Sequence, residues 1–164
     1  MKKFHSILAI ALLAAGSAAA QDTKPAAGAC PPPPKELVTK DLEKGEGEAV
    51  AFRTAVQVSY TGWLYDGCAK DLKGEKFDTS DGRVTPFGFM VGAGRVIKGW
   101  DEGLIGIQKG GKRLLVIPAD KAYGARSPTP KIPPNSALVF EVTLTNILAS
   151  PSAPPGVNMT QPQK

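Results

Sequence analysis

Apolar and polar residues alternate along two long stretches of the chain, and this period of two predicts β-strands. In residues 51–65, Val56, Val58 and Tyr60 share one face of the predicted strand. Residues 137–148 show the clearest alternation, because a polar side chain separates most of the apolar ones. The apolar face of that strand carries four residues: Leu138, Phe140, Val142 and Leu144. Each strand is therefore expected to place one face on a core and the other face in water.

Shorter segments extend the predicted sheet. Residues 85–91 place Phe87 and Phe89 on one face, and residues 112–118 are apolar on both faces, so we expect a strand at each. Residues 37–44 are ambiguous and either form the first strand or precede it. Glycine-rich and polar composition predicts a turn at 45–47 and loops at 66–76 and 119–135.

The spacing of large apolar residues becomes helical near residues 96–104. Trp100, Leu104 and Ile107 recur at i, i+4 and i+7, which is one face of a helix. Glycine lowers helix propensity by about 1 kcal/mol relative to alanine, and the segment contains Gly99, Gly103 and Gly106. Such a helix should form only when it packs against a larger element. We therefore expect a sheet beneath it, with Trp100 at the floor of an apolar pocket.

Together these elements predict an α+β fold in which an antiparallel sheet of four or five strands wraps halfway around one short α-helix. The length of 164 residues is enough for one domain with tails. We place the folded domain at residues 37–148. Residues 21–36 are rich in proline and alanine and are expected to form an extended linker, and residues 149–164 a disordered tail.

The first 20 residues have the three parts of a secretory signal peptide. Lys2 and Lys3 precede a short apolar run, and three alanines at 18–20 form a small-residue cleavage site. The run is too short for a membrane span, and an uncleaved anchor is the alternative. The mature protein is therefore expected to be periplasmic or secreted.

Export would change the chemistry that the chain can perform. His5 is the sole histidine and would be removed, which excludes Ser-His-Asp catalysis and histidine-ligated metals, so no metal or cofactor is expected. In an oxidising compartment a disulfide between Cys30 and Cys68 is the default. Free or intermolecular thiols and a lipid anchor at Cys30 are the alternatives.

The charge pattern argues against a nucleic-acid partner. The formal net charge is +5, but the lysines are scattered among acids and form no basic stripe. The Gly92-x-Gly94 motif has neither a surrounding βαβ unit nor a following lysine-serine pair, so we do not expect it to bind phosphate.

Seven sequence blocks, in order along residues 37–148, resemble the FKBP-type peptidyl-prolyl cis-trans isomerases. They are Val58-Ser59-Tyr60-Thr61-Gly62, Lys76-Phe77-Asp78-Thr79-Ser80, Pro86-Phe87-Gly88-Phe89, Val96-Ile97-Lys98-Gly99-Trp100-Asp101-Glu102-Gly103, Ala122-Tyr123-Gly124-Ala125, Ile132-Pro133-Pro134 and Leu138-Val139-Phe140-Glu141-Val142. No single block is decisive, but seven in this order are highly specific. Residues 66–76 are longer than in the smallest family members, and Pro128 stands where some members carry a histidine.

The resemblance implies which residues form the site. It assigns catalytic roles to Asp78, Tyr123 and Ile97. The Ile97 N–H would donate a hydrogen bond to a ligand carbonyl, and Arg83 would pair with Asp78. Substrate-binding positions fall on a further six residues: Tyr60, Phe77, Phe87, Val96, Trp100 and Phe140. For Asp78, a buried salt-bridged carboxylate that shapes the pocket is the preferred reading over a direct role in the transition state.

The resulting expectation is a peptidyl-prolyl isomerase that rotates X–Pro bonds of exported protein clients by desolvating them in an aromatic pocket. The expected partners are proline-containing polypeptides and macrolide ligands, and the protein is expected to be a monomer without nucleic-acid or membrane partners. A periplasmic proline-binding chaperone or interaction module with incidental catalysis is the alternative. The rate of X–Pro isomerisation in a short peptide separates the two.

Overall fold

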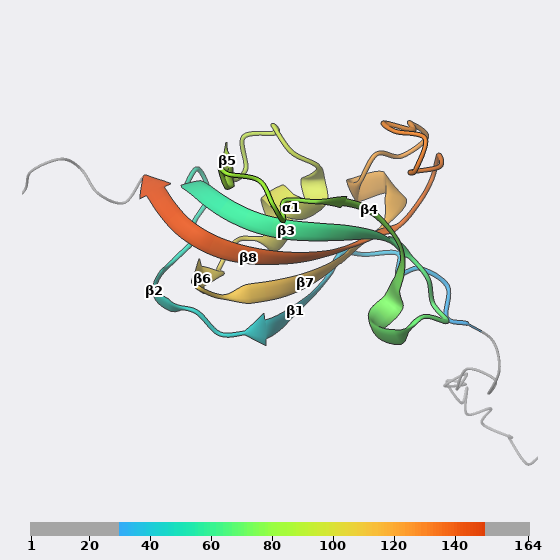
Figure 1. The fold of residues 1–164 in the computed structure, drawn as a ribbon, viewed down its shortest axis with the longest axis horizontal. Helices are drawn as coiled ribbons and strands as arrows, with labels where there is room; N and C mark the ends of the chain where they lie inside the picture. The colour runs from blue at the N-terminus through green and yellow to red at the C-terminus, as the bar shows by residue number, and fades with distance from the viewer. Residues whose placement is uncertain (1–29, 150–164) are drawn as a thin grey trace, which may run out of the picture.

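The sheet expected from the alternating strands is present in the computed structural model, which describes residues 30–149 (Figure 1). Its strands run in the order β1-β7-β8-β3-β4, β5 pairs with the remaining part of the β3 edge, and β2 and β6 form a separate pair. All pairings are antiparallel. The bounds are β1 Val38–Glu43, β2 Glu46–Ala49, β3 Ala55–Tyr65, β4 Lys73–Thr79, β5 Phe87–Met90, β6 Gln108–Lys109, β7 Lys112–Ile117 and β8 Leu138–Ala149. The α+β prediction is therefore confirmed.

The two strands with the clearest alternation, β3 and β8, lie at the centre of the sheet. Tyr60 is paired with Val142, and Gly62 with Phe140, so the apolar residues of both strands share one face. Val58, Val142 and the other inward residues of β8 are almost completely buried. The observed β3 begins at Ala55, later than predicted, because the preceding residues form a turn in which the Thr54 Oγ1 accepts a hydrogen bond from the Ala51 N–H at 3.1 Å.

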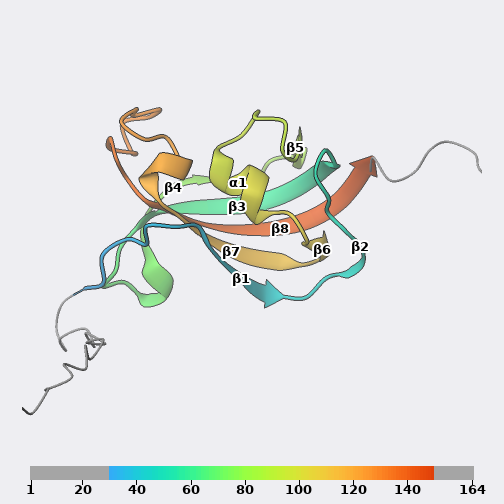
Figure 2. The same ribbon diagram turned by 180° about the vertical axis from the view of Figure 1, so that it is seen from behind.

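The single α-helix of the described residues, α1 (Lys98–Gly103), lies across the inner face of the sheet (Figure 2). Its glycines let it approach β7 closely, since a Cβ on Gly103 would lie 2.8 Å from Cδ2 of Leu115. A Cβ on Gly99 would meet the Ile117 side chain in the same way. Close packing therefore compensates for the low helix propensity of this segment. The predicted burial of Trp100, Leu104 and Ile107 is confirmed, but the helix is shorter than the predicted face, because it ends at Gly103 and Ile107 lies beyond it.

Three predictions about the edges of the sheet were wrong. Four or five strands were expected, but eight are present in the described residues. The turn expected at 45–47 overlaps β2, and the loop expected at 66–76 contains the first half of β4 together with a short 3₁₀ helix, Lys70–Leu72. These segments are polar, because an edge strand needs a backbone partner on only one side and can face water on both surfaces. A second 3₁₀ helix, Ala119–Lys121, begins the long loop after β7.

A disulfide joins Cys30 to Cys68 at a Cα–Cα distance of 4.8 Å. The Tyr65 hydroxyl also donates to the carbonyl oxygens of Pro31 and Pro32, at 3.0 and 3.1 Å. The end of the predicted 21–36 linker is therefore held against the end of β3. The predicted signal peptide, residues 21–29 of the linker and residues 150–164 of the tail lie outside the described residues. No helix in residues 30–149 is long and apolar enough to cross a membrane.

Candidate active site

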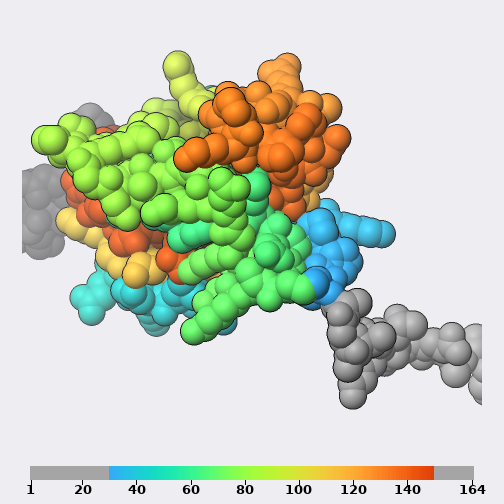
Figure 3. Space-filling view, turned by 45° about the vertical axis from the view of Figure 1, so that its right-hand side comes forward, coloured from blue at the N-terminus to red at the C-terminus, as the bar shows by residue number. Residues whose placement is uncertain are grey.

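A cavity of about 330 Å³ opens on the helix side of the sheet. Figure 3 shows the segments that surround this side: residues 73–97, in green, lie next to the loop that follows β7, in orange. Eleven residues from these segments, β3, α1 and β8 line the cavity: Tyr60, Phe77, Asp78, Phe87, Gly94, Arg95, Val96, Ile97, Trp100, Tyr123 and Phe140. The structure thus brings all nine sequence-predicted positions to one cavity. Gly94 and Arg95 were missed, although they directly precede the predicted Val96.

Aromatic rings form the floor and walls of the cavity. The Trp100 indole is 4% exposed, and its ring centroid lies 5.1 Å from that of Tyr60 and 5.3 Å from that of Phe140. Both contacts are edge-to-face, the geometry that the ring quadrupoles favour. Phe77 packs on Phe140 in the same way, at 5.5 Å. Trp100 therefore lies at the pocket floor, as the helical spacing predicted.

Gly62 explains how the rings of neighbouring strands meet. A Cβ at this position of β3 would lie 2.7 Å from atoms of both the Phe77 and the Phe140 rings. The absence of a side chain therefore leaves the space in which these two rings make contact. Phe89, by contrast, packs against Phe87 and Trp100 at 5.6 Å from each but does not line the cavity.

The loop before α1 is held in place by Asp101. Its carboxylate accepts hydrogen bonds from the Gly92 N–H at 2.7 Å and the Gly94 N–H at 2.9 Å. Both glycines have positive φ angles, 78° and 68°, which other residues rarely adopt. The two N–H groups that a phosphate would need are therefore already bonded, and the loop is fixed over the cavity.

Asp78 is surrounded by hydrogen-bond donors. It accepts from the Tyr60 hydroxyl at 2.7 Å, from the Thr79 N–H at 2.9 Å and from the Arg83 guanidinium at 3.1 Å. Burial and, next, the hydrogen bond to the Asp78 carboxylate raise the pKa of Tyr60 to about 12. Tyr60 consequently stays protonated and donating at neutral pH. The Asp78 carboxylate is paired with Arg83, as the resemblance implied, but its side chain is 43% exposed and not buried as expected. Its contacts position the Tyr60 ring.

Several donors of cavity-lining residues have no partner within residues 30–149. Among them are the Ile97 N–H, the Tyr123 hydroxyl and the buried Trp100 Nε1. Burial and, to a smaller extent, the Asp78 charge raise the pKa of Tyr123, so its hydroxyl is also protonated at neutral pH. The Ile97 carbonyl already accepts from the Trp100 N–H at 2.9 Å, which anchors the residue at the start of α1.

The chemistry of this arrangement is binding rather than bond cleavage. Apolar rings surround a space large enough for a proline ring, and the free donors suit an uncharged carbonyl group. No activated nucleophile lies among the lining residues. Residues 30–149 contain no group of three His, Cys, Asp or Glu side chains arranged to hold a metal ion.

Comparison with known proteins agrees with this geometry. The family profile described as FKBP-type peptidyl-prolyl cis-trans isomerase matches residues 47–145. A relative named FK506-binding protein, from Neisseria meningitidis serogroup A / serotype 4A, is 43% identical over 111 residues, which cover 68% of this chain and 95% of the relative. FK506-binding protein 2 of Dictyostelium discoideum is 47% identical over 92 residues, 56% of this chain and 64% of the relative.

Two crystal structures show a similar fold. AtFKBP13 superposes with a TM-score of 0.58 at 32% identity, over 68% of this chain and 93% of that one. FkpA from Escherichia coli superposes with a TM-score of 0.56 at 44% identity, over 68% of this chain and 47% of that one. The sheet, the helix and the aromatic cavity are typical of a peptidyl-prolyl isomerase, or rotamase. The chain belongs to the FKBP-type peptidyl-prolyl cis-trans isomerase family, and it is an enzyme of that type.

Proposed function

We propose that the aromatic cavity takes the proline ring of an exported polypeptide and accelerates rotation about the preceding amide bond by removing it from water. The observation that carries this proposal is the coincidence of apolar rings and a free Ile97 N–H in one cavity. An X–Pro bond rotates over tens to hundreds of seconds without catalysis. No bond is broken in the reaction, so the site needs no nucleophile, metal or base.

Desolvation lowers the free-energy difference between the planar and the twisted amide. The planar amide is dipolar through resonance, and water stabilises that dipole, whereas the twisted amide is less polar. Rings such as Trp100 and Phe87 offer no replacement for the lost water, which favours the twisted form. The Ile97 N–H is placed to hold a substrate carbonyl during rotation. A thousandfold acceleration requires about 4 kcal/mol of transition-state stabilisation, a reasonable sum for desolvation and one or two oriented hydrogen bonds.

Each polar residue then has a role in this proposal. Ile97 binds the carbonyl, and Tyr123 donates a second hydrogen bond from the loop after β7. Asp78 acts as a positioning residue, because its contacts hold Tyr60 and Arg83 at the wall. The names of the relatives support a macrolide such as FK506 as a second ligand of the same cavity. Binding next to the Trp100 indole should change its fluorescence.

Replacement of Asp78 by Val tests the proposed site. We expect kcat/KM for a Leu-Pro tetrapeptide to fall about tenfold, which corresponds to about 1.4 kcal/mol, because Tyr60 and Arg83 lose their common acceptor. Asp81→Val is the matched control, since Asp81 is exposed and does not line this cavity. Its kcat/KM should stay within twofold of the wild type (a factor worth about 0.4 kcal/mol). The measured quantity is the rate of cis-to-trans isomerisation of the peptide. Circular dichroism checks that both variants are folded.

The same assay separates catalysis by desolvation from other mechanisms. With no proton transfer, the wild-type rate should be flat in the neutral pH range and show no solvent deuterium isotope effect. A bell-shaped pH profile would contradict desolvation and indicate general acid-base catalysis. The chaperone alternative predicts a different result. The folded wild type would not accelerate isomerisation of the peptide but would prevent aggregation of an unfolded client, and Asp78→Val would prevent that aggregation equally well.

We also propose that the enzyme acts outside the cytoplasm, as a monomer. The signal-like first 20 residues support export, and the Cys30–Cys68 disulfide is of the kind that oxidising compartments favour. The expected mass of the protein recovered from the bacterial periplasm or medium is that of residues 21–164, less two hydrogen atoms. A mass that includes the first 20 residues, a lipid or two reduced thiols would contradict this expectation.

A further inference from the structure

We propose that Arg95 makes this enzyme prefer clients with an acidic residue within two positions of the isomerised proline. The inference rests on the proposed function, because it concerns the polypeptide that the aromatic cavity would hold. It adds a specificity-determining residue to a site in which nine of the eleven lining residues were predicted from the sequence. Arg95 lines the cavity and is exposed.

Of the two charged residues that line the cavity, Asp78 and Arg95, only Arg95 has no ion-pair partner in the described residues. Asp78 is paired with Arg83, and each of the two Asp101 carboxylate oxygens accepts a backbone N–H of the loop before α1. Within residues 30–149, Arg95 makes no salt bridge. Its positive charge is therefore available to a polypeptide bound in the cavity.

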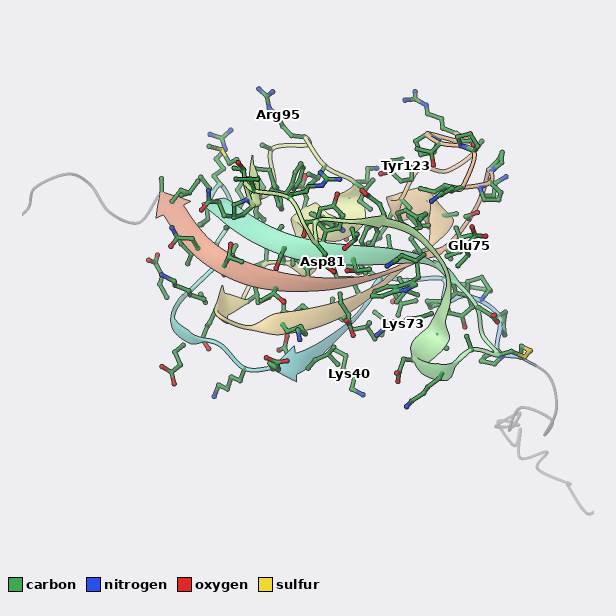
Figure 4. All side chains as sticks on the ribbon, viewed as in Figure 1. Lys40, Lys73, Glu75, Asp81, Arg95 and Tyr123 are labelled. Carbon is green, nitrogen blue, oxygen red and sulfur yellow. A yellow bond between two sulfur atoms is a disulfide. The ribbon has the colours of Figure 1, made fainter. Side chains whose placement is uncertain are left out.

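The position of Arg95 suits contact with a residue beside the proline rather than with the proline itself. It belongs to the loop between β5 and α1, and its side chain extends outward from that loop, away from the sheet (Figure 4). It lies two residues before Ile97, whose free N–H is the proposed carbonyl donor. An extended peptide advances about 3.3 Å per residue. A residue one or two positions from the proline would thus lie within reach of a long arginine side chain.

The strength expected for this contact is modest because it lies in water. Exposed ion pairs contribute about 0.2–1 kcal/mol, so the effect on kcat/KM should be about two- to fivefold. Salt should weaken the preference, because the Debye length is about 8 Å at physiological ionic strength and about 3 Å at 1 M.

The test compares matched peptides that carry Glu or Gln at either of the two positions before the proline, or at either of the two positions after it. The measured quantity is the ratio of kcat/KM for the Glu peptide to that for the Gln peptide, which is insensitive to any general loss of activity. At low salt the wild-type ratio should be about two to five at one position or more. Arg95→Ala should bring that ratio to about one, and Arg95→Glu should invert it.

Lys98→Ala is the matched control. Lys98 carries the same charge close to Ile97 and is exposed, but it does not line the cavity. Its variant should keep the wild-type ratio. A wild-type ratio of one at all four positions, or an equal change in Lys98→Ala, would overturn the role of Arg95 while leaving the proposed function intact. Failure of the wild type to accelerate any of the peptides would instead contradict the proposed function.

Discussion

Replacement of Phe140 by Ala is expected to lower the free energy of unfolding by about 3–5 kcal/mol and to remove most of the isomerase activity. Phe140 is 3% exposed and contacts the rings of Trp100, Phe77 and Tyr60. Truncation would leave a cavity in the centre of the sheet, which cannot collapse easily because β8 is paired on both sides by β3 and β7. Urea unfolding measures the first effect, and the X–Pro peptide assay the second.

Two further variants keep this prediction interpretable. Phe140→Leu preserves most of the volume and should lose only about 1 kcal/mol, so its activity reports on the ring rather than on unfolding. Phe52→Ala removes a phenylalanine that is 58% exposed, and it should change stability much less than Phe140→Ala. Equal losses for Phe52→Ala and Phe140→Ala would show that the aromatic cluster does not stabilise the fold as described.

The second large effect is expected at Arg113, which connects the helix to the sheet. Its Nη1 donates to the carbonyl oxygens of Gly103 and Ile105, at 2.8 and 2.9 Å, where α1 ends. Its other donors contact the Asp41 carboxylate on β1, and the residue is only 9% exposed. Arg113→Met keeps the apolar stem but leaves these acceptors without a donor. We expect a loss of about 2–4 kcal/mol, since an unsatisfied buried group costs about 1–3 kcal/mol.

The loss at Arg113 should extend to activity, because α1 carries Trp100. Thermal or urea unfolding gives the stability change, and Trp fluorescence shows whether the cavity floor has moved. Lys112→Met is the control on the same strand. It breaks the Lys112–Glu43 pair, which lies nearer the solvent and should contribute little to stability. A loss at Lys112 as large as at Arg113 would contradict the proposed role of the buried guanidinium.

The effect of Arg113→Met should also depend on pH. The hydrogen bond from Arg113 lowers the pKa of Asp41 below its ordinary value of 3.8. A lowered folded-state pKa contributes stability above the unfolded value, and this contribution is lost as pH falls through the folded value. The variant lacks the contribution, so the difference in stability between wild type and Arg113→Met should narrow as the pH falls below 3.8. A difference that widened under acid would contradict this account of Asp41.

The parts of the fold that the sequence predicted are those in which local pattern and burial coincide. β3 and β8 are central and half-buried, so their alternating residues show directly which face is apolar. The burial of Trp100, Leu104 and Ile107 could be predicted from their spacing for the same reason. The site positions could be predicted because they fall in the seven sequence blocks that resemble the FKBP-type isomerases.

The edge strands and the ion contacts could not be read in this way. β2 and the start of β4 are polar strands defined by backbone pairing with β6 and β3, and no side-chain period marks them. Arg113 and Asp101 look like ordinary surface charges in the sequence. Only the crossing of α1 over the sheet brings Arg113 to the carbonyls at the end of the helix, and only the bend of the preceding loop brings two N–H groups to Asp101.

The amino-acid sequence by itself determined the fold class, the central strands, the short glycine-rich helix and the set of rings that could meet a proline. Hydrophobic periodicity is a local property, so the chain carries that information at every position. The tertiary structure alone decided the strand order, the pairing of the polar edges, the hydrogen bond from Tyr60 to Asp78 and the unpaired charge of Arg95 at the cavity. These depend on which distant segments become neighbours, and that choice is made by the packing of the whole sheet against α1.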